Sequence, residues 1–264
     1  MSNNSMLSVK NLTSGYGDKV ILNGISFEVH KNEVVGILGA NGCGKTTLIN
    51  SLCRIISSKG EVLVDGTDVS TWSNKVFAQN CSLVPQKSGI GIDISVLDVV
   101  LMGFNPFLSL MARPTKEMVT KAEKQLKVFA LEDRMYDNFQ NLSEGQKQIV
   151  IICRSLVTDT KVLLMDEPES SLDFAIRYSM LDTVSKQIKE TDKCALISLH
   201  DVNFALRYCD KLLLVKDGSI SSVIDVTAED RITIEQKLKT IYGDIKLLSV
   251  PDSENKESLI MVKA

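Results

Sequence analysis

The chain has 264 residues, 44% of them hydrophobic, and its 30 basic and 33 acidic residues give a formal net charge of -3. This composition predicts a globular protein with one domain, or one domain with a subdomain, and a substantial core. No basic run favours a nucleic-acid partner, and no apolar run approaches the ~20 residues needed to cross a bilayer. Because the N-terminus lacks the basic and apolar regions of a secretory signal, we expect a cytoplasmic protein.

The six cysteines form no C-x-x-C pair and have no histidine nearby at zinc-finger spacing. A reducing cytosol keeps such cysteines as thiols. We expect Cys43, which lies inside a glycine-rich loop, to be exposed and open to oxidation. The other five are predicted to be small buried hydrophobic side chains: Cys53, Cys81, Cys153, Cys194 and Cys209.

The first third of the chain is predicted to be rich in β-strands, because β-branched residues lie there between Gly, Asn and Asp turn signals. The predicted strands cover residues 7–16, 25–30 and 61–69. From about Ser95 to Val157 the pattern is helical. Within it, residues 115–131 begin at a predicted N-cap, Thr115. The apolar residues spaced for one face of this helix are Met118, Ala122, Leu126 and Phe129.

The last third predicts a parallel sheet. Two apolar runs, residues 161–166 and 194–200, flank a helix-like segment at 175–190, which is the β-α-β order of such a sheet. The next apolar run predicts a hairpin turned at Asp217 and Gly218. The C-terminal end predicts a short strand-forming or partly disordered tail.

The strongest motif is "GANGCGKT", which follows the apolar strand "VVGIL" and precedes a helical pattern. Gly39, Gly44, Lys45 and Thr46 match the phosphate-loop pattern G-x-x-x-x-G-K-[ST]. Glycines let the backbone close around phosphate oxygens, Lys45 neutralises phosphate charge, and the Thr46 hydroxyl is suited to ligate Mg²⁺. The alternative is a glycine-rich turn with an incidental lysine. The predicted phosphate-binding residues are Gly39, Ala40, Asn41, Gly42, Cys43, Gly44, Lys45, Thr46 and Thr47.

The strand "KVLLMD" ends in two adjacent carboxylates, Asp166 and Glu167. Successive side chains of a strand point to opposite faces, so the two are expected to have different roles. Asp166 is predicted to hold Mg²⁺ through bound water, and Glu167 to act as the base that polarises an attacking water. Alone, "DEP" is more simply a strand-end turn, but the upstream phosphate loop favours the catalytic interpretation.

The stretch "NLSEGQKQ" could hold a second phosphate at the start of a helix. Its structural alternative is a capping box, in which Ser143 and Gln146 satisfy the first helical N–H groups. The order of motifs along the chain favours the functional interpretation. These motifs are the phosphate loop at 39–46, "LSEGQ" at 142–146, "LLMDEP" at 163–168, "SSLD" at 170–173 and "LISLHD" at 196–201.

Together these motifs resemble the ATPase subunits of ATP-binding cassette (ABC) transporters, over about residues 5–225. The resemblance implies an α/β fold with a P-loop NTPase (RecA-like) core and a mainly parallel sheet. It adds an N-terminal antiparallel β-subdomain and an inserted α-helical subdomain. We therefore expect a single ABC ATPase domain over residues 1–264. The nucleotide-binding core with its β-subdomain is expected at 1–86 and 158–264, and the helical subdomain at 87–157.

In that family two subunits face each other head to tail, and each ATP lies between the phosphate loop of one and the signature helix of the other. The resemblance therefore implies ATP and Mg²⁺ as cofactors and a second copy of the chain as partner. By the same resemblance, Ser143, Gly145 and Gln146 contact the ATP held by the partner. The remaining implied roles are adenine stacking by Tyr16, sensing of Mg²⁺ and water by Gln86, interface crossing by Asp173 and γ-phosphate contact by His200. For Tyr16, an ordinary strand tyrosine is the alternative.

The signature departs from the usual L-S-G-G-Q, because Glu144 stands in the third position. Its carboxylate favours the helix dipole but adds negative charge near a bound triphosphate. We expect the side chain to point to solvent or to Lys147, so that ATP still binds. The "SSLD" loop also has Ser171 where the family commonly has alanine, a milder change.

The segment "SVLDVVLMGFNPF" resembles that of ATPases serving importers of iron–siderophore complexes, haem and cobalamin, although Phe104 replaces a common arginine. This implies integral membrane permease subunits as partners, a substrate-binding protein as an indirect partner, and a peripheral position on the cytoplasmic face of the membrane. Phe104 and Phe107 are expected either to dock a permease or to belong to the core. Two functional alternatives are a soluble non-transport ABC ATPase and an ATPase-weak regulatory subunit.

Overall fold

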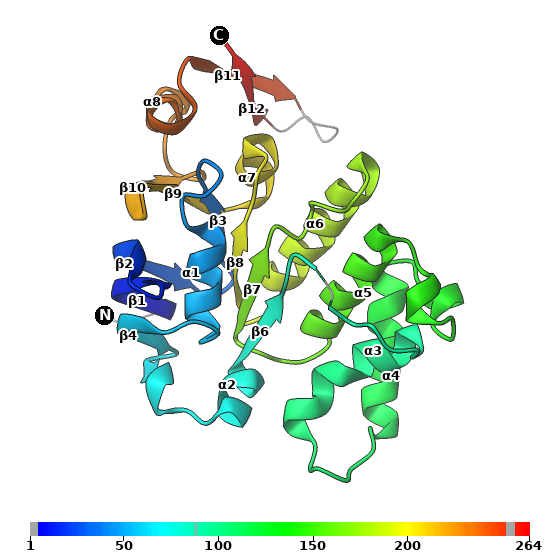
Figure 1. The fold of residues 1–264 in the computed structure, drawn as a ribbon. Helices are drawn as coiled ribbons and strands as arrows, with labels where there is room; N and C mark the ends of the chain where they lie inside the picture. Colours follow the sequence, from blue (N-terminus) through cyan, green and yellow to red (C-terminus); the bar gives the residue numbers. More distant parts are fainter. Residues whose placement is uncertain (1–4, 88, 252–256) are drawn as a thin grey trace.

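The computed structural model describes residues 5–87, 89–251 and 257–264, and a six-stranded sheet lies at its centre (Figure 1). The strand order is β10-β9-β3-β8-β7-β6, with every neighbouring pair parallel except β9 and β10. Every residue of β3, β7 and β8 is buried, as expected for parallel strands covered on both faces. The strands are β3 (Val34–Leu38), β6 (Cys81–Val84), β7 (Val162–Asp166), β8 (Cys194–Ser198), β9 (Lys211–Lys216) and β10 (Ser219–Asp225).

A second, antiparallel sheet of four strands lies to the left in Figure 1, in the order β2-β1-β4-β5. The strands are β1 (Ser5–Tyr16), β2 (Lys19–His30), β4 (Ser58–Val64) and β5 (Thr67–Asp68). Helix α1 (Lys45–Leu52) joins the two sheets, because Leu48 packs in one apolar cluster with Leu7 of β1 and Leu164 of β7. This sheet confirms the predicted N-terminal β-subdomain.

The segment between β6 and β7 is helical and lies to the right in Figure 1. Thr115 caps α4, as predicted, and the α4 side chains Ala122 and Leu126 are fully buried. The α-helices of this region are α2 (Asn74–Asn80), just before β6, then α3 (Val96–Leu101), α4 (Lys116–Val128) and α5 (Glu144–Leu156). Short 3₁₀ helices cover Val69–Thr71, Met102–Phe107, Glu132–Arg134 and Phe139–Asn141.

After β7 the chain alternates helices with strands, and the helices of this part are α6 (Phe174–Lys189) and α7 (Val202–Tyr208). The chain then ends in a small C-terminal unit at the top of Figure 1, which consists of α8 (Arg231–Tyr242), β11 (Ile245–Pro251) and β12 (Glu257–Lys263). Strands β11 and β12 form an antiparallel hairpin against α7, where Met261 N donates to Asn203 Oδ1 at 2.7 Å. The predicted strand-forming tail is therefore an ordered hairpin, and its residues 252–256 lie outside the described residues.

These elements confirm the predicted fold class. The hairpin turn is also confirmed, since Asp217 and Gly218 have φ of 49° and 74°. No helix within the described ranges is long and apolar enough to cross a membrane. Four of the five cysteines predicted to be buried are buried. The fifth, Cys53 at the C-terminal end of α1, is only partly buried, although it packs against the same apolar cluster as Leu48. The residue boundaries proposed for the subdomains stay a prediction.

Candidate functional site

The phosphate loop connects β3 to α1 and needs glycine at two places. A Cβ at Gly39 would lie 2.3 Å from the carbonyl oxygen of Val215, and Gly44 has a φ of 111°. The Lys45 side chain is 5% exposed, and its Nζ donates to Gly39 O at 3.1 Å, so the ammonium lies back over the loop. This is the shape that the phosphate-loop motif predicts.

Asp166 ends β7 beside the first turn of α1. Its Oδ1 accepts hydrogen bonds from Thr46 Oγ1 at 3.2 Å and from Ser198 Oγ at 2.8 Å. Burial raises the pKa of Asp166, and these two hydrogen bonds oppose the rise. The structure therefore brings the predicted hydroxyl and carboxylate together.

Ser198 was not predicted from the sequence. Its side chain is fully buried at the end of β8, and its Oγ also accepts from the Glu167 backbone N at 2.9 Å. One hydroxyl thus fixes both carboxylate residues at the end of β7. The only sequence signal was its place at the end of an apolar strand, directly before "LH".

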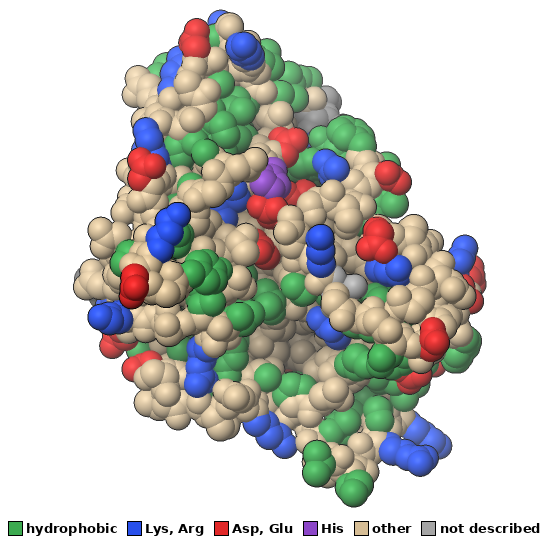
Figure 2. Space-filling view, viewed as in Figure 1, with side chains coloured by type: hydrophobic (Ala, Val, Ile, Leu, Met, Phe, Trp, Pro, Cys, Tyr) green, Lys and Arg blue, Asp and Glu red, His purple; other side chains and the backbone are tan. Residues whose placement is uncertain are grey.

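Glu167 follows the last residue of β7, and its backbone has an unusual φ of 46°. Its side chain has other partners than that of Asp166. Its Oε2 accepts from Gln86 Nε2 at 2.8 Å and lies 2.7 Å from His200 Nε2. Figure 2 shows a histidine among acidic side chains on this face, above a hollow. Two residues predicted from distant motifs, Gln86 and His200, therefore meet at the Glu167 carboxylate.

The cavity beside this carboxylate has a volume of about 360 Å³. It is lined by Ile21, Asn41, Gly42, Gly44, Lys45, Thr46, Thr47, Glu167 and His200. It therefore combines backbone amides of a helix N-terminus with one lysine, two hydroxyls and a carboxylate. This combination suits a phosphate chain with a reactive end at Glu167 and His200.

Not every residue predicted to bind the nucleotide lines that cavity: Tyr16, Gly39, Ala40 and Cys43 do not. Tyr16 lies at the end of β1 with 51% of its surface exposed, so it is free to stack on a ligand but does not line the cavity. Cys43 is partly buried, and burial raises the pKa of its thiol. The Cys43 side chain is therefore less exposed than expected, and its oxidation stays a prediction.

The second predicted phosphate-binding segment, residues 142–146 and called the second cradle below, lies at the start of α5. Ser143 Oγ accepts from Gln146 N at 3.3 Å, and Gln146 Oε1 accepts from Ser143 N at 3.1 Å, so the capping box is present. Glu144 is 77% exposed and lies 2.9 Å from Lys147 Nζ, as predicted. Neither this turn nor Asp173, the N-cap of α6, lines the cavity of its own phosphate loop. The residues predicted to contact a partner's nucleotide are therefore separate from the site in the same chain.

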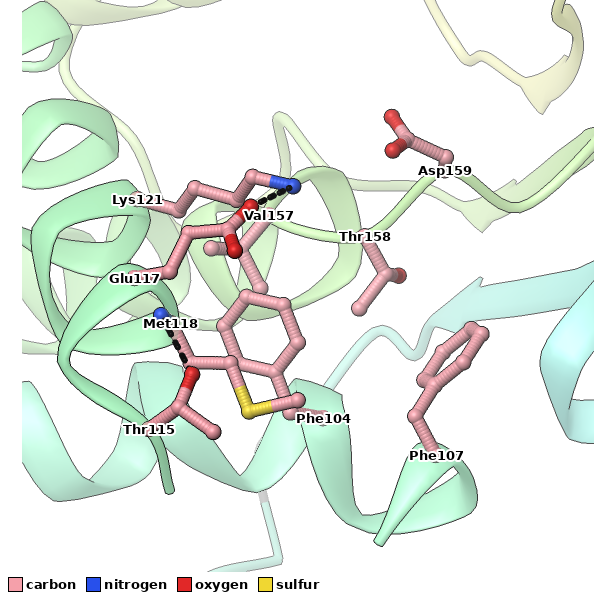
Figure 3. Close-up of a pocket in the computed structure, with 9 residues that line it drawn as sticks. All are labelled: Phe104, Phe107, Thr115, Glu117, Met118, Lys121, Val157, Thr158 and Asp159. Carbon is pink, nitrogen blue, oxygen red and sulfur yellow. Dashed lines mark hydrogen bonds and ion pairs between the residues drawn. The ribbon is translucent and has the colours of Figure 1, made fainter.

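The two phenylalanines of the helical region have different surroundings. Figure 3 shows Phe104 and Phe107 at a pocket of about 180 Å³, together with Met118 and Val157. Phe104 is 5% exposed and belongs to the core, so the structural alternative holds for it. Phe107 is 42% exposed, and Leu110 in the following loop is fully exposed. The exposed apolar surface thus lies slightly further along the chain than expected.

Known proteins match this sequence over most of its length. The family model described as ABC transporter matches residues 22–170. An uncharacterised ABC transporter ATP-binding protein of Methanocaldococcus jannaschii is 35% identical over 239 residues, which cover 90% of this chain and 91% of that protein. A Helicobacter pylori ATP-binding protein named for iron chelatin transport is 32% identical over 250 residues, covering 92% and 98%. A hemin import ATP-binding protein of Pseudomonas fluorescens is 33% identical over 264 residues, covering 98% and 100%.

Solved structures match the fold as well. One, described as a metal-chelate type ABC transporter in an inward-facing conformation, has a TM-score of 0.81 and 25% identity, covering 98% of this chain and 97% of the other. A dimeric ATP-binding cassette in a post-hydrolysis state with ADP and Pi has a TM-score of 0.74 and 25% identity, covering 84% and 99%. Sequence and fold therefore point to the same family.

Proposed function

The chain belongs to the ABC transporter family as an ATPase subunit, and we propose that two copies of it close on two ATP molecules to drive a separate importer permease. The observation that carries the proposal is the cluster at the end of β7. There Glu167 is held by Gln86 and His200, beside Asp166 and Thr46. An ATPase needs a base, an anion cradle and cation ligands within one cavity, and these five residues combine with the phosphate loop to supply them.

The proposed nucleotide site is the cavity of the phosphate loop. The amides of residues 39–47 and the N-terminus of α1 bind the phosphates, and Lys45 neutralises charge on the β- and γ-phosphates. Tyr16 stacks on the adenine, for which its half-exposed ring at the end of β1 is suited. The roles of these residues are part of the proposal.

The donor set also fits Mg²⁺. Magnesium prefers hard oxygen ligands and keeps several waters, and the Thr46 hydroxyl and Asp166 carboxylate lie 3.2 Å apart beside the phosphate loop. Gln86, whose side chain reaches the same cluster, completes the proposed set. When bound with ATP, the ion would neutralise charge on the β- and γ-phosphates.

Hydrolysis is assigned to Glu167. Its carboxylate accepts a proton from water as the water oxygen bonds to the γ-phosphorus, and the bond to the bridging oxygen of ADP breaks. Gln86 donates to Glu167 Oε2, so it fixes the direction of the base. The His200 imidazole, 2.7 Å from the same oxygen and 45% exposed, is placed to contact the γ-phosphate as well.

The second cradle is assigned to the ATP of the partner copy. Ser143, Gly145 and Gln146 begin α5, a helix of 13 residues whose N-terminus attracts anions. Asp173 begins α6 and would cross the interface. A dimeric cassette is among the similar solved structures, which supports dimerisation of this chain.

The cargo is assigned from relatives and remains a proposal. The names of similar proteins refer to iron chelatin transport and hemin import, which supports an importer of iron–siderophore complexes, haem or cobalamin. The permease would dock on the exposed apolar surface formed by Phe107, Leu110 and Met111, within the helical subdomain proposed at residues 87–157. This would keep the chain on the cytoplasmic face of the membrane and link it indirectly to a substrate-binding protein.

The first experiment compares ATP hydrolysis by the chain and by Glu167→Gln, with light scattering as MgATP is added. We expect the variant to lose about 10²- to 10⁴-fold in kcat and to form a stable ATP-dependent dimer, because ATP binds without being cleaved. Glu132→Gln, which neutralises an exposed carboxylate of a 3₁₀ helix, is the matched control and should hydrolyse normally. Absence of both turnover and dimer in the chain and its variant would contradict the proposal.

A cellular experiment tests the cargo. In cells whose only copy carries Glu167→Gln, uptake of labelled iron–siderophore, haem or cobalamin should fall to background for one of the three. Unchanged uptake of all three would contradict the importer assignment while leaving the ATPase assignment intact.

A further inference from the structure

A third carboxyl group, Glu169, lies beside the proposed catalytic cluster and has no part in the mechanism above. It is 3% exposed, in the short segment between Glu167 and Asp173. Its Oε1 accepts a hydrogen bond from the backbone N of His200 at 3.1 Å. Its Oε2 is buried and has no hydrogen-bond partner within the described part of the chain. A buried carboxyl with an unsatisfied oxygen is costly, so its presence calls for an explanation.

The contact with His200 fixes the loop that carries the imidazole. This loop leaves β8 at Ser198 and enters α7 two residues after His200. Leu199 N donates to Ile37 O at 3.1 Å, so β3 holds one side of the loop. Glu169 holds the next amide. The backbone of the loop is therefore fixed at Leu199 and at His200, and this fixes the position from which the His200 imidazole contacts Glu167.

Glu169 also belongs to the segment that leads to the proposed dimer interface. Its carbonyl oxygen accepts from Leu172 N at 3.1 Å, directly before Asp173, and Glu167 O accepts from Ser170 N at 3.2 Å. The turn that carries Asp173 is therefore built on the same residue that anchors His200. The Glu169 side chain therefore links the Asp173 turn to the His200 backbone, alongside the contact that Glu167 makes with the imidazole.

We propose that Glu169 is a positioning residue, which holds the His200 backbone through Oε1 and links it to the Asp173 turn. The inference rests on the proposed function, because it gives His200 a role in turnover. Glu169 touches neither nucleotide nor water in this role. Its contribution acts through His200 alone.

Glu169 Oε1 accepts from the His200 amide, a role that an ionised and a neutral carboxyl group can both fill. Burial raises the pKa of Glu169, and the negative charge of Glu167 adds to the rise, whereas the His200 backbone hydrogen bond opposes it. A neutral carboxylic acid still accepts through its carbonyl oxygen. The amide of glutamine has the same acceptor and the same length, so Glu169→Gln is the conservative variant. Glu169→Met keeps the length but removes the acceptor.

The test is a double-mutant cycle on kcat with Glu169→Met, His200→Ala and both together. We expect Glu169→Met to lower kcat about tenfold, which is the effect of losing one buried hydrogen bond, and Glu169→Gln to keep more than half of the turnover. In the His200→Ala background, Glu169→Met should lower kcat less than twofold, because the imidazole that it positions is already absent. An equal loss in both backgrounds would overturn the inference, since a general loss of folding acts in both.

Amide hydrogen exchange tests the contact without turnover. The His200 amide should exchange at least tenfold faster in Glu169→Met than in Glu169→Gln, whereas the Leu199 amide, held by Ile37 O, should change little. Equal protection of His200 in the two variants would overturn the inference. If the chain hydrolyses ATP and His200→Ala impairs it but Glu169→Met does not, the inference fails and the proposed function stands. If neither the chain nor any variant hydrolyses ATP, the proposed function fails, and the inference fails with it.

Discussion

Replacing Glu144 by glutamine is predicted to weaken folding while strengthening ATP-dependent association. The carboxylate lies at the first helical residue of α5, 2.9 Å from Lys147 Nζ and 77% exposed. A carboxylate at a helix N-terminus is worth about 0.3–1 kcal/mol, and an exposed ion pair about 0.2–1 kcal/mol. Glutamine keeps the size of the side chain and removes both contributions. The free energy of unfolding should therefore fall by about 0.5–2 kcal/mol.

Association should change in the opposite direction, because the same carboxylate flanks the turn proposed to bind the partner's γ-phosphate. Removing an exposed like charge is worth about 0.2–1 kcal/mol at each site on the same scale. A homodimer contains two such sites, so the total is about 0.4–2 kcal/mol. This corresponds to a dimer dissociation constant about two- to thirtyfold lower.

The assay measures dimer formation by light scattering in the Glu167→Gln background, with MgATP, at about 50 mM and about 500 mM salt, and thermal unfolding in parallel. The gain from Glu144→Gln should shrink at high salt, because exposed charges are screened. Lys147→Gln is the matched control: it leaves Glu144 unpaired and should weaken the dimer. Unchanged association at low salt, or the same gain at both salt concentrations, would refute the electrostatic reasoning.

Two further predictions concern tyrosines near the phosphate loop. Burial raises the pKa of Tyr242, near Gly39 and Cys43, to about 12, from an ordinary value of 10.0. The folded chain keeps this proton when the unfolded chain loses it, so its stability is present below about pH 10 and is lost as the pH rises towards 12. Tyr242→Phe should therefore show a smaller fall in Tm over that range, and an equal fall in both chains would count against the argument. Tyr16→Ala should raise the KM for ATP about fivefold to tenfold with a much smaller change in kcat. A fall in kcat with an unchanged KM would contradict the stacking role.

Local motifs predicted most of the geometry of the proposed site because each motif determines its own local conformation. The phosphate loop, the end of β7 and the turn before α5 each consist of contiguous residues. Their conformations follow from glycine freedom, strand alternation and helix capping. The sequence alone therefore places Lys45 at the start of a helix, Asp166 at the end of a strand and Ser143 at a helix N-cap.

Long-range contacts could not be predicted in the same way. Ser198 reaches Asp166 because the two residues pair across β7 and β8, and this register depends on strands that are far apart in the sequence. Glu169 meets the His200 amide for a similar reason. Phe104 is buried and Phe107 exposed within one 3₁₀ helix, since its rotation is set by packing against the surrounding helices.

The phosphate loop, as the first cradle, and the second cradle both attract anions to the N-terminus of a helix, but they differ in charge. This difference explains why a chain would carry both. The phosphate loop adds a buried lysine to its helix N-terminus, so it can hold a triphosphate unaided. At the start of α5, Glu144 and Lys147 cancel each other, and only the amides and the dipole remain. Such a weak cradle would bind a γ-phosphate only when the first cradle of another copy presents it. Under the proposed function, cleavage of that phosphate removes the shared ligand, and the dimer opens again without any further change in either chain.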